Sequence, residues 1–280
     1  MIEDWRNGRR IGVFGDKGQD VIVLHGGPGA AGGSDPVAIE LSDTFKTYSP
    51  WQRRREGIPL SVDIHVQDLK DLIELKCTNA KPALVGESWG AMLALAFACK
   101  YPSWVSSIAL VGCGTYAKGP RQKLVETRIA RINDFVERNP EFAEDLKLSV
   151  MDQIMKWHGM TDTYCAQEDR LTLPDSSEDF DKIGFEETWN DMLHCQQKEI
   201  YPQQFAKILC PVIMLHGSYD PHPGRITFEQ LREFIPQLEY KEFEKCGHAP
   251  SIEKYARTEF FGFLKNWLSD KMMMTTALKN

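Results

Sequence analysis

The segment Gly86-Glu87-Ser88-Trp89-Gly90 constrains the fold of this chain more than any other stretch. The apolar residues 81–85 before it are typical of a buried strand. Residues 91–100 after it are rich in small and straight-chain side chains and stop before Pro102, which indicates a helix. A strand that turns directly into a helix leaves room only for small residues on either side of the turn. The segment therefore predicts a sharp turn that holds Ser88 at a strand end, beside a helix N-terminus.

Strand and helix patterns alternate on both sides of this turn. Continuous β-branched runs such as residues 21–24 are typical of strands that are buried on both faces. The alternation predicts an α/β fold with a mostly parallel sheet and helices on both of its faces. We expect strands at residues 10–15, 21–24, 45–49, 81–85, 108–112, 211–217 and 238–243, and flanking helices at 62–75, 91–100, 225–234 and 253–268.

The pattern changes after residue 115. Residues 120–204 carry little strand signal, and their helical stretches, 124–136 and 143–157, hold many charged and aromatic side chains. Strand and helix then alternate again from residue 211. We therefore expect a core formed by residues 1–115 and 206–280, with residues 116–205 inserted as a helical cap.

Length and charge limit the classes of function. A chain of 280 residues is long enough for one large domain with an insertion, and a net charge of −7 argues against a nucleic-acid partner. No apolar stretch is long enough to cross a membrane, and Met1-Ile2-Glu3-Asp4-Trp5-Arg6 does not begin a signal peptide. The seven cysteines have no paired or metal-type spacing, so we expect reduced thiols in a cytoplasmic protein. A small molecule or short peptide is the expected partner.

Two residues later in the chain could activate Ser88. A serine hydroxyl becomes a good nucleophile when a histidine takes its proton and a carboxylate orients that histidine. Asp220 lies just beyond the strand at 211–217, and His248 shortly follows the strand at 238–243. Taken alone, Asp220 fits a turn residue equally well and His248 could be an ordinary loop histidine. All three at strand ends, in the order Ser88, Asp220, His248, predict a catalytic triad.

Three motifs resemble one known family over most of residues 10–270. His25-Gly26-Gly27-Pro28-Gly29, Gly86-Glu87-Ser88-Trp89-Gly90 and Cys246-Gly247-His248-Ala249-Pro250 with Glu253 are similar to motifs of the proline iminopeptidase-like branch of the α/β-hydrolase superfamily. The resemblance implies an α/β-hydrolase fold and an oxyanion hole formed by the main-chain N–H of Trp89 and one from Gly26 or Gly27. Such donors suit a developing oxyanion. We expect His25 and Glu87, which adjoin them, to contact the substrate.

The chain also departs from the family pattern. Trp51-Gln52-Arg53-Arg54-Arg55 replaces the usual Asp-Gln-Arg-Gly stretch, and Glu87 stands where peptidase members often have glycine. In iminopeptidases, cap carboxylates hold the free amine of the substrate. Glu186 and Glu187, with Asp191, are candidates for that role, although the sequence favours a solvated helical face for this cluster.

No metal or cofactor is predicted. His216 and His222 flank Asp220, but no further ligands follow at a suitable spacing, so both are interpreted as turn residues. The sequence predicts a serine hydrolase that cleaves a small amide or ester, with an aminopeptidase favoured and a carboxylesterase or lactonase as the alternative. A non-catalytic binding protein with the same fold is the alternative from another class, and the complete triad disfavours it.

Overall fold

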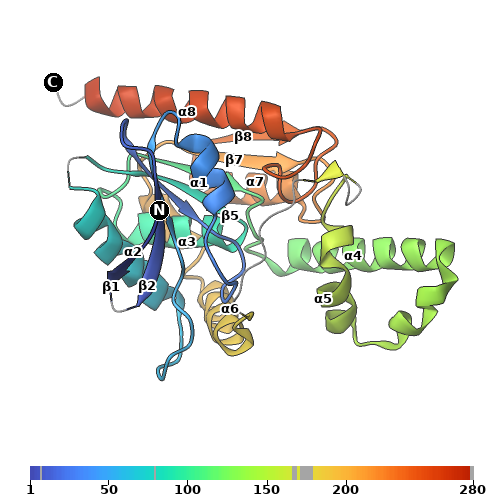
Figure 1. Ribbon diagram of the computed structural model, residues 1–280. Coiled ribbons are helices and arrows are strands. Elements are labelled where there is room, and N and C mark those ends of the chain that lie inside the picture. Colours follow the sequence, from blue (N-terminus) through green and yellow to red (C-terminus); the bar gives the residue numbers. More distant parts are fainter. Residues whose placement is uncertain (7, 79, 166–168, 171–178, 278–280) are drawn as a thin grey trace.

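The computed structural model describes residues 1–277 except for residues 7, 79, 166–168 and 171–178 (Figure 1). The described residues form one eight-stranded sheet in the order β1-β2-β4-β3-β5-β6-β7-β8. Only the β1–β2 and β2–β4 pairs are antiparallel. The predicted, mostly parallel sheet is therefore confirmed. The strands are β1 (Ile2–Arg6), β2 (Arg9–Phe14), β3 (Asp20–Leu24), β4 (Lys46–Pro50), β5 (Ala83–Glu87), β6 (Ser107–Val111), β7 (Val212–Gly217) and β8 (Leu238–Phe243).

Helices cover both faces of the sheet, as the sequence predicts (Figure 1). Because successive side chains of a strand point to opposite faces, β3 contributes to two cores. Val21 and Val23 pack with the buried faces of α1 (Asp35–Leu41) and α8 (Arg257–Ala277). Ile22 and Leu24 belong to the core on the other face, which includes α2 (Val62–Lys76), α3 (Trp89–Lys100) and α7 (Gly224–Arg232).

Two elements were not predicted, and the last helix begins and ends later than predicted. β1 was not predicted, because it is an edge strand in which only Trp5 is buried and no apolar run marks it. α1 was also missed, because it has only seven residues and carries a proline in its first turn. α8 begins at Arg257 rather than 253 and continues to Ala277. Its start is delayed because Glu253 lies in the preceding turn, where its buried side chain binds main-chain N–H groups.

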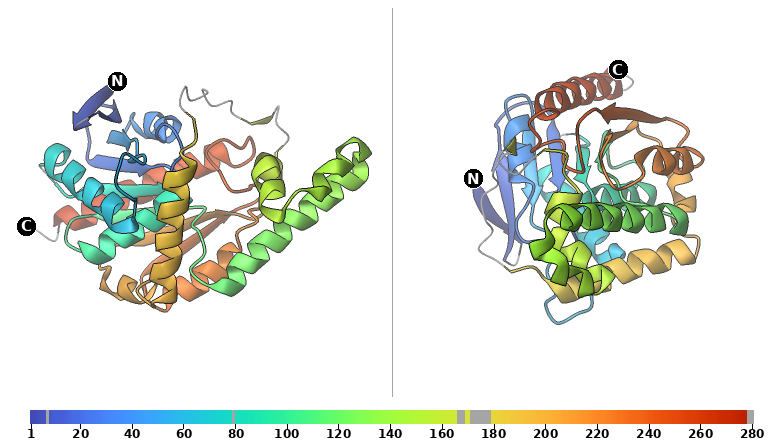
Figure 2. Two further views of the ribbon diagram at one scale, coloured as in Figure 1. Left: turned by 90° about the horizontal axis from the view of Figure 1, so that it is seen from below. Right: turned by 90° about the vertical axis from the view of Figure 1, so that its right-hand side faces the viewer.

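The described residues between β6 and β7 add no strand to the sheet. They form α4 (Lys118–Arg138), η1 (Pro140–Lys147), α5 (Val150–Thr161), α6 (Lys182–Gln197) and η3 (Gln203–Lys207). α4 and α5 pack together and extend away from the sheet, whereas α6 lies against α2 (Figure 2). Where the structure describes residues 116–205, their regular elements are helices. The predicted helix at 143–157 is wrong, because Leu148 is extended (φ −66°, ψ 159°) and separates η1 from α5.

Six of the seven cysteines are buried, and all seven have free thiols. Burial raises the pKa of both Cys99 and Cys113 to about 12, so these side chains stay protonated and pack as small apolar groups. Within the described ranges, no helix combines the length and the apolar character that crossing a membrane requires.

Candidate active site

Ser88 lies in a strained turn between β5 and α3. Its φ and ψ angles are 52° and −113°, a positive φ that residues other than glycine rarely adopt. A Cβ atom on Gly86 would lie 2.5 Å from the Ala91 nitrogen, and a Cβ on Gly90 would lie 2.8 Å from the His25 oxygen. Since real side chains do not approach main-chain atoms so closely, the two glycines permit the turn. The predicted geometry of the Gly86–Gly90 segment is confirmed.

The loop after β3 brings main-chain N–H groups close to Ser88. A Cβ on Gly26 would lie 3.0 Å from the Cβ of Ser88, so the two residues are in contact. Among the described residues, the N–H groups of Gly26, Gly27 and Trp89 have no hydrogen-bond acceptor. Gly27 has a φ of +64°, which glycine adopts without strain. Donors without a partner beside a serine are what binding of an oxyanion requires.

His25 and Gln52 hold this loop against the Ser88 turn. The His25 ring contacts the Gly26 carbonyl oxygen through Nδ1 (2.9 Å) and accepts the Gln52 N–H at Nε2 (3.1 Å). The Gln52 side-chain amide donates to the His25 carbonyl oxygen (2.8 Å) and accepts the indole N–H of Trp89 (2.8 Å). Both ring nitrogens of His25 are thus engaged with main-chain groups. In the sequence, Gln52 stood out only as part of the 51–55 stretch that departs from the family pattern. Its role as the link between the loop and the turn was not predicted.

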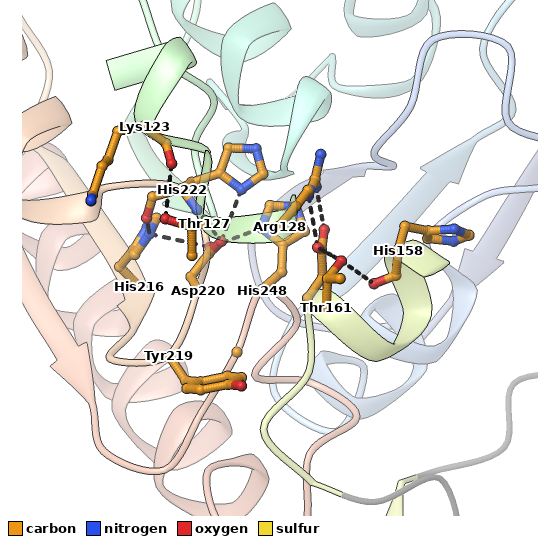
Figure 3. Close-up of polar contacts among 12 residues, drawn as sticks. Lys123, Thr127, Arg128, His158, Thr161, His216, Tyr219, Asp220, His222 and His248 are labelled. Atoms are coloured by element: carbon orange, nitrogen blue, oxygen red, sulfur yellow. Dashed lines mark hydrogen bonds and ion pairs between the residues drawn. The ribbon is translucent and has the colours of Figure 1, made fainter. Parts of the chain in front are cut away.

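Asp220 and His248 are joined by a hydrogen bond of 2.8 Å between Oδ2 and Nδ1 (Figure 3). Burial opposes the charge on Asp220, but His248, His216 and His222 hold its pKa well below the usual value. Burial also lowers the pKa of His248, yet the charge and hydrogen bond of Asp220 and the charge of Asp162 outweigh it, so the pKa lies above the usual value. With its Nδ1–H donated to Asp220, neutral His248 leaves Nε2 as a base.

The loop that carries His248 is anchored by two acidic residues. Glu253 is fully buried and accepts the N–H of Gly247 (2.6 Å) and those of Tyr164 and Cys165 (2.9 and 3.0 Å). The main-chain N–H of His248 donates to the Asp162 carbonyl oxygen (2.7 Å). Residues of the inserted segment therefore fix the loop.

The Asp162 carboxylate is itself held by Arg128, which forms a two-pronged ion pair with it. Burial raises the pKa of Asp162, but the Arg128 bonds and charge dominate and keep it below the usual value. Asp162 is therefore ionised and lies close enough to His248 to favour its protonated form. Sequence reasoning missed Arg128 and Asp162, because neither stands in a motif.

Ser88 and His248 both lie at the carboxyl end of β6. The main-chain N–H of Ser88 donates to the Val111 carbonyl oxygen (2.7 Å), and a Cβ on the next residue, Gly112, would lie 2.9 Å from the His248 ring. Within the described residues, no hydrogen bond joins the Ser88 hydroxyl to His248. The structure thus joins Asp220 to His248 directly and brings both Ser88 and His248 to the end of β6. Catalytic hydrogen bonds often tighten only when substrate binds.

Glu87 connects the two loops on either side of Ser88. Its carboxyl accepts the hydroxyl of Ser34 (2.6 Å) from the loop after β3 and that of Ser251 (3.3 Å) from the His248 loop. Burial raises the pKa of Glu87, and the two hydroxyl bonds and the charge of His248 partly offset this. Glu87 adjoins Ser88 in the chain, and a substrate contact by Glu87 stays a prediction.

Glu186 and Glu187 have different surroundings on α6. Glu187 accepts the N–H of Leu60 (2.8 Å) and pairs with Arg55 (3.4 Å), while Glu186 is exposed and lies 3.9 Å from Lys182. Asp191 accepts the N–H of Val62 (2.8 Å). Glu187 and Asp191 therefore fasten α6 to the segment that leads into α2. A substrate contact by Glu186 or Glu187 stays a prediction.

We expect Glu187→Gln to lower stability by about 1 kcal/mol, because it weakens a charge-assisted hydrogen bond to Leu60. Glu186→Gln is the matched control on the exposed side of the same helix, and we expect no change from it. Urea unfolding would measure both. If Glu187→Gln instead unfolds like the wild type and raises KM for amine substrates alone, its role is substrate binding rather than fastening.

Asp220, His222 and His248 form the single group of three potential metal ligands in the described part of the chain, with ligand atoms within 4.8 Å of one another. The two histidine rings are stacked, with centroids 4.4 Å apart and an interplanar angle of 18°. Because the lone pairs of stacked rings run nearly parallel, they do not converge on one ion about 2 Å from each nitrogen. We interpret the group as a hydrogen-bonded cluster.

Comparisons with known proteins agree with this architecture. The alpha/beta hydrolase fold family matches residues 20–255. The proline iminopeptidase of Lactobacillus acidophilus is 23% identical over 281 residues and covers 89% of each chain. The 2-hydroxy-6-oxo-2,4-heptadienoate hydrolase of Pseudomonas putida is 26% identical over 263 residues, with 85% of each chain covered.

A solved structure, that of a serine hydrolase from Cycloclasticus zankles, superposes with a TM-score of 0.70 at 18% identity and covers 96% of this chain and 98% of that one. At this identity the likeness shows the shared fold. The resemblance to the proline iminopeptidase-like branch is confirmed at low identity. Since the family match spans most of the sequence, the chain belongs to the α/β-hydrolase fold family.

Proposed function

We propose that the chain is a serine hydrolase with residues 116–205 as a helical cap. The observation that carries this proposal is the Asp220–His248 hydrogen bond, together with a serine held at positive φ whose main-chain N–H bonds to the end of β6, where the His248 ring also lies. A buried carboxylate that orients an imidazole serves a serine nucleophile. The unpartnered N–H groups of Gly27 and Trp89 support the same chemistry.

In the proposed reaction, the Ser88 hydroxyl attacks the substrate carbonyl while His248 Nε2 accepts its proton. Asp220 keeps His248 in the required tautomer and stabilises its charged form. The N–H groups of Trp89 and of Gly27 or Gly26 bind the oxyanion. His248 then returns the proton to the leaving group, and an acyl-enzyme remains. Water, deprotonated by His248, attacks the acyl carbonyl, and Ser88 leaves with the proton. The scheme needs no cofactor.

We propose a small amide with an N-terminal proline or a similar residue as the substrate. Similarity to proline iminopeptidases supports this choice. A small acyl ester or lactone is the second candidate, and one observation favours it. Glu187 and Asp191, two of the three cap carboxylates considered for amine binding, already bind the core of the protein.

A fluorophosphonate probe and two substrates test the proposal. We expect the probe to modify Ser88, as mapped by mass spectrometry of the labelled peptide. Turnover of proline 4-nitroanilide above that of 4-nitrophenyl butyrate would support the aminopeptidase, and the reverse would support the esterase. A folded protein that is neither labelled nor active on any amide or ester would refute the hydrolase and favour the binding-protein alternative.

A further inference from the structure

The Asp220 carboxylate has more imidazole neighbours than a catalytic triad needs. Oδ2 accepts His248 Nδ1–H (2.8 Å) and lies 3.2 Å from His216 Nε2. Oδ1 accepts both the main-chain N–H (2.9 Å) and the ring Nδ1–H (2.8 Å) of His222. Figure 3 shows these side chains around Asp220. The Asp220 side chain is 0% exposed, so water does not screen these contacts. Its charge is therefore divided between two ring N–H donors.

His222 is placed to act on His248 and not only on the turn. The two rings stack at 4.4 Å, and both direct Nδ1 towards the same carboxylate. His216 supports this arrangement, because its Nε2–H donates to the His222 carbonyl oxygen (3.0 Å). A Cβ on Gly224 would lie 2.6 Å from Cγ of His216 and closer still to another atom of its ring, so glycine at that position leaves space for the ring.

We propose that His222 is a positioning residue that competes with His248 for the charge of Asp220, and so extends to lower pH the range in which His248 is a free base. The inference rests on the proposed function, in which His248 is the base. It gives His222 a part in setting the pH below which kcat/KM falls.

The direction of the effect follows from the hydrogen bonds. Burial lowers the pKa of His222 to about 4, and Asp220 only partly opposes this, so His222 is a neutral donor at working pH. Without its ring N–H, Oδ1 would keep more negative charge, and Asp220 would stabilise protonated His248 more strongly. The pKa of His248 would then rise. Because a base of higher pKa becomes protonated at a higher pH, the enzyme would then lose activity at a higher pH on acidification.

A substitution at position 222 leaves the identities of the other titratable or charged groups near His248 as they are. His216 and Asp220 come from β7 and the loop after it. Asp162 and Arg128 come from the inserted segment, and Glu87 lies at the end of β5. Any shift between variants therefore reports on His222 itself.

His222→Phe removes the ring N–H and keeps an aromatic ring for stacking. We expect the pKa of His248, followed by NMR of histidine-labelled protein, to rise by about 0.5 to 1 unit, as the loss of a hydrogen bond of about 1 kcal/mol predicts. The acid limb of kcat/KM should move up equally, while the plateau at high pH stays within about threefold. His158→Phe, an exposed histidine on α5, is the matched control with no expected shift.

His222→Asn is the rescue variant, because its side-chain amide can donate to Asp220 where the imidazole did. We expect His248 to titrate in it as in the wild type. An unshifted or lowered pKa in His222→Phe would overturn the inference, as would an Asn variant that shifts like the Phe variant. The NMR titration needs no turnover, so it separates two failures. If the hydrolase proposal is wrong, the probe leaves Ser88 unlabelled. If this inference is wrong, His222→Phe leaves the His248 titration unchanged.

Discussion

Ser88→Ala is expected to lower kcat/KM by about 10⁴ to 10⁶ and to abolish labelling by the fluorophosphonate probe. The hydroxyl is the atom that forms the acyl bond in the proposed reaction, and no neighbouring side chain can replace it. The fold should be retained, because alanine keeps the Cβ that Ser88 already has at this positive φ and removes only the hydroxyl, for which the described residues show no hydrogen bond. Steady-state kinetics and intact-mass measurement after labelling check both expectations.

Ser218→Ala is the matched control for this experiment. Ser218 is an exposed serine two residues before Asp220, directly after β7, and its side chain takes no part in the proposed reaction. We expect wild-type turnover and labelling from this variant. A Ser88→Ala protein that still turns over substrate and still carries the label would rule out Ser88 as the nucleophile.

Gly90→Ala is expected to lower the free energy of unfolding by about 3 to 5 kcal/mol, a large part of the total for a domain. The added Cβ would lie 2.7 Å from the Leu24 carbonyl carbon and 2.8 Å from the His25 oxygen. These are main-chain atoms of β3 and its loop, so no side-chain rotation relieves the clash. Either α3 moves away from the sheet or the loop that carries Gly26 and Gly27 is displaced. Urea denaturation would measure the loss.

Gly262→Ala provides the control for adding a methyl group to a helical glycine. Gly262 lies within α8, has nothing within 4 Å of its would-be Cβ and is exposed. We expect this variant to be more stable by about 0.5 to 1 kcal/mol, because alanine favours the helix and restricts the unfolded chain. A Gly90→Ala protein as stable as the wild type would show that the turn is looser than the structure indicates.

Much of the architecture could be predicted from local patterns. The strands β3, β5, β6 and β7 have apolar runs because both faces of each are buried, and that signal does not depend on distant residues. β1 and α1 gave no such signal. One is an edge strand with a single buried side chain, and the other is a short helix that starts with a proline turn. Their structures depend on the neighbours against which they pack.

Some residues of the candidate site could likewise be predicted from the sequence, and others could not. The positions of Ser88, Asp220 and His248 could be predicted from strand ends and chain order, because parallel strands carry their carboxyl ends to one edge of the sheet. Gln52, Arg128 and Asp162 could not, since their roles arise from contacts with residues that lie far away in the sequence. The sequence also treated His216 and His222 as turn residues, because nothing local indicates a shared carboxylate.

Local chemistry thus decided where the chain turns, which segments are strands and which serine the sharpest turn presents, since these depend on side-chain size and short-range periodicity. Only the tertiary structure decided how many imidazoles share Asp220 and which parts of the inserted segment hold the His248 loop. Those contacts join residues up to 89 positions apart, such as Tyr164 and Glu253. Hydrogen bonds over such separations depend on the sheet, which brings distant strand ends together, and so no local pattern encodes them.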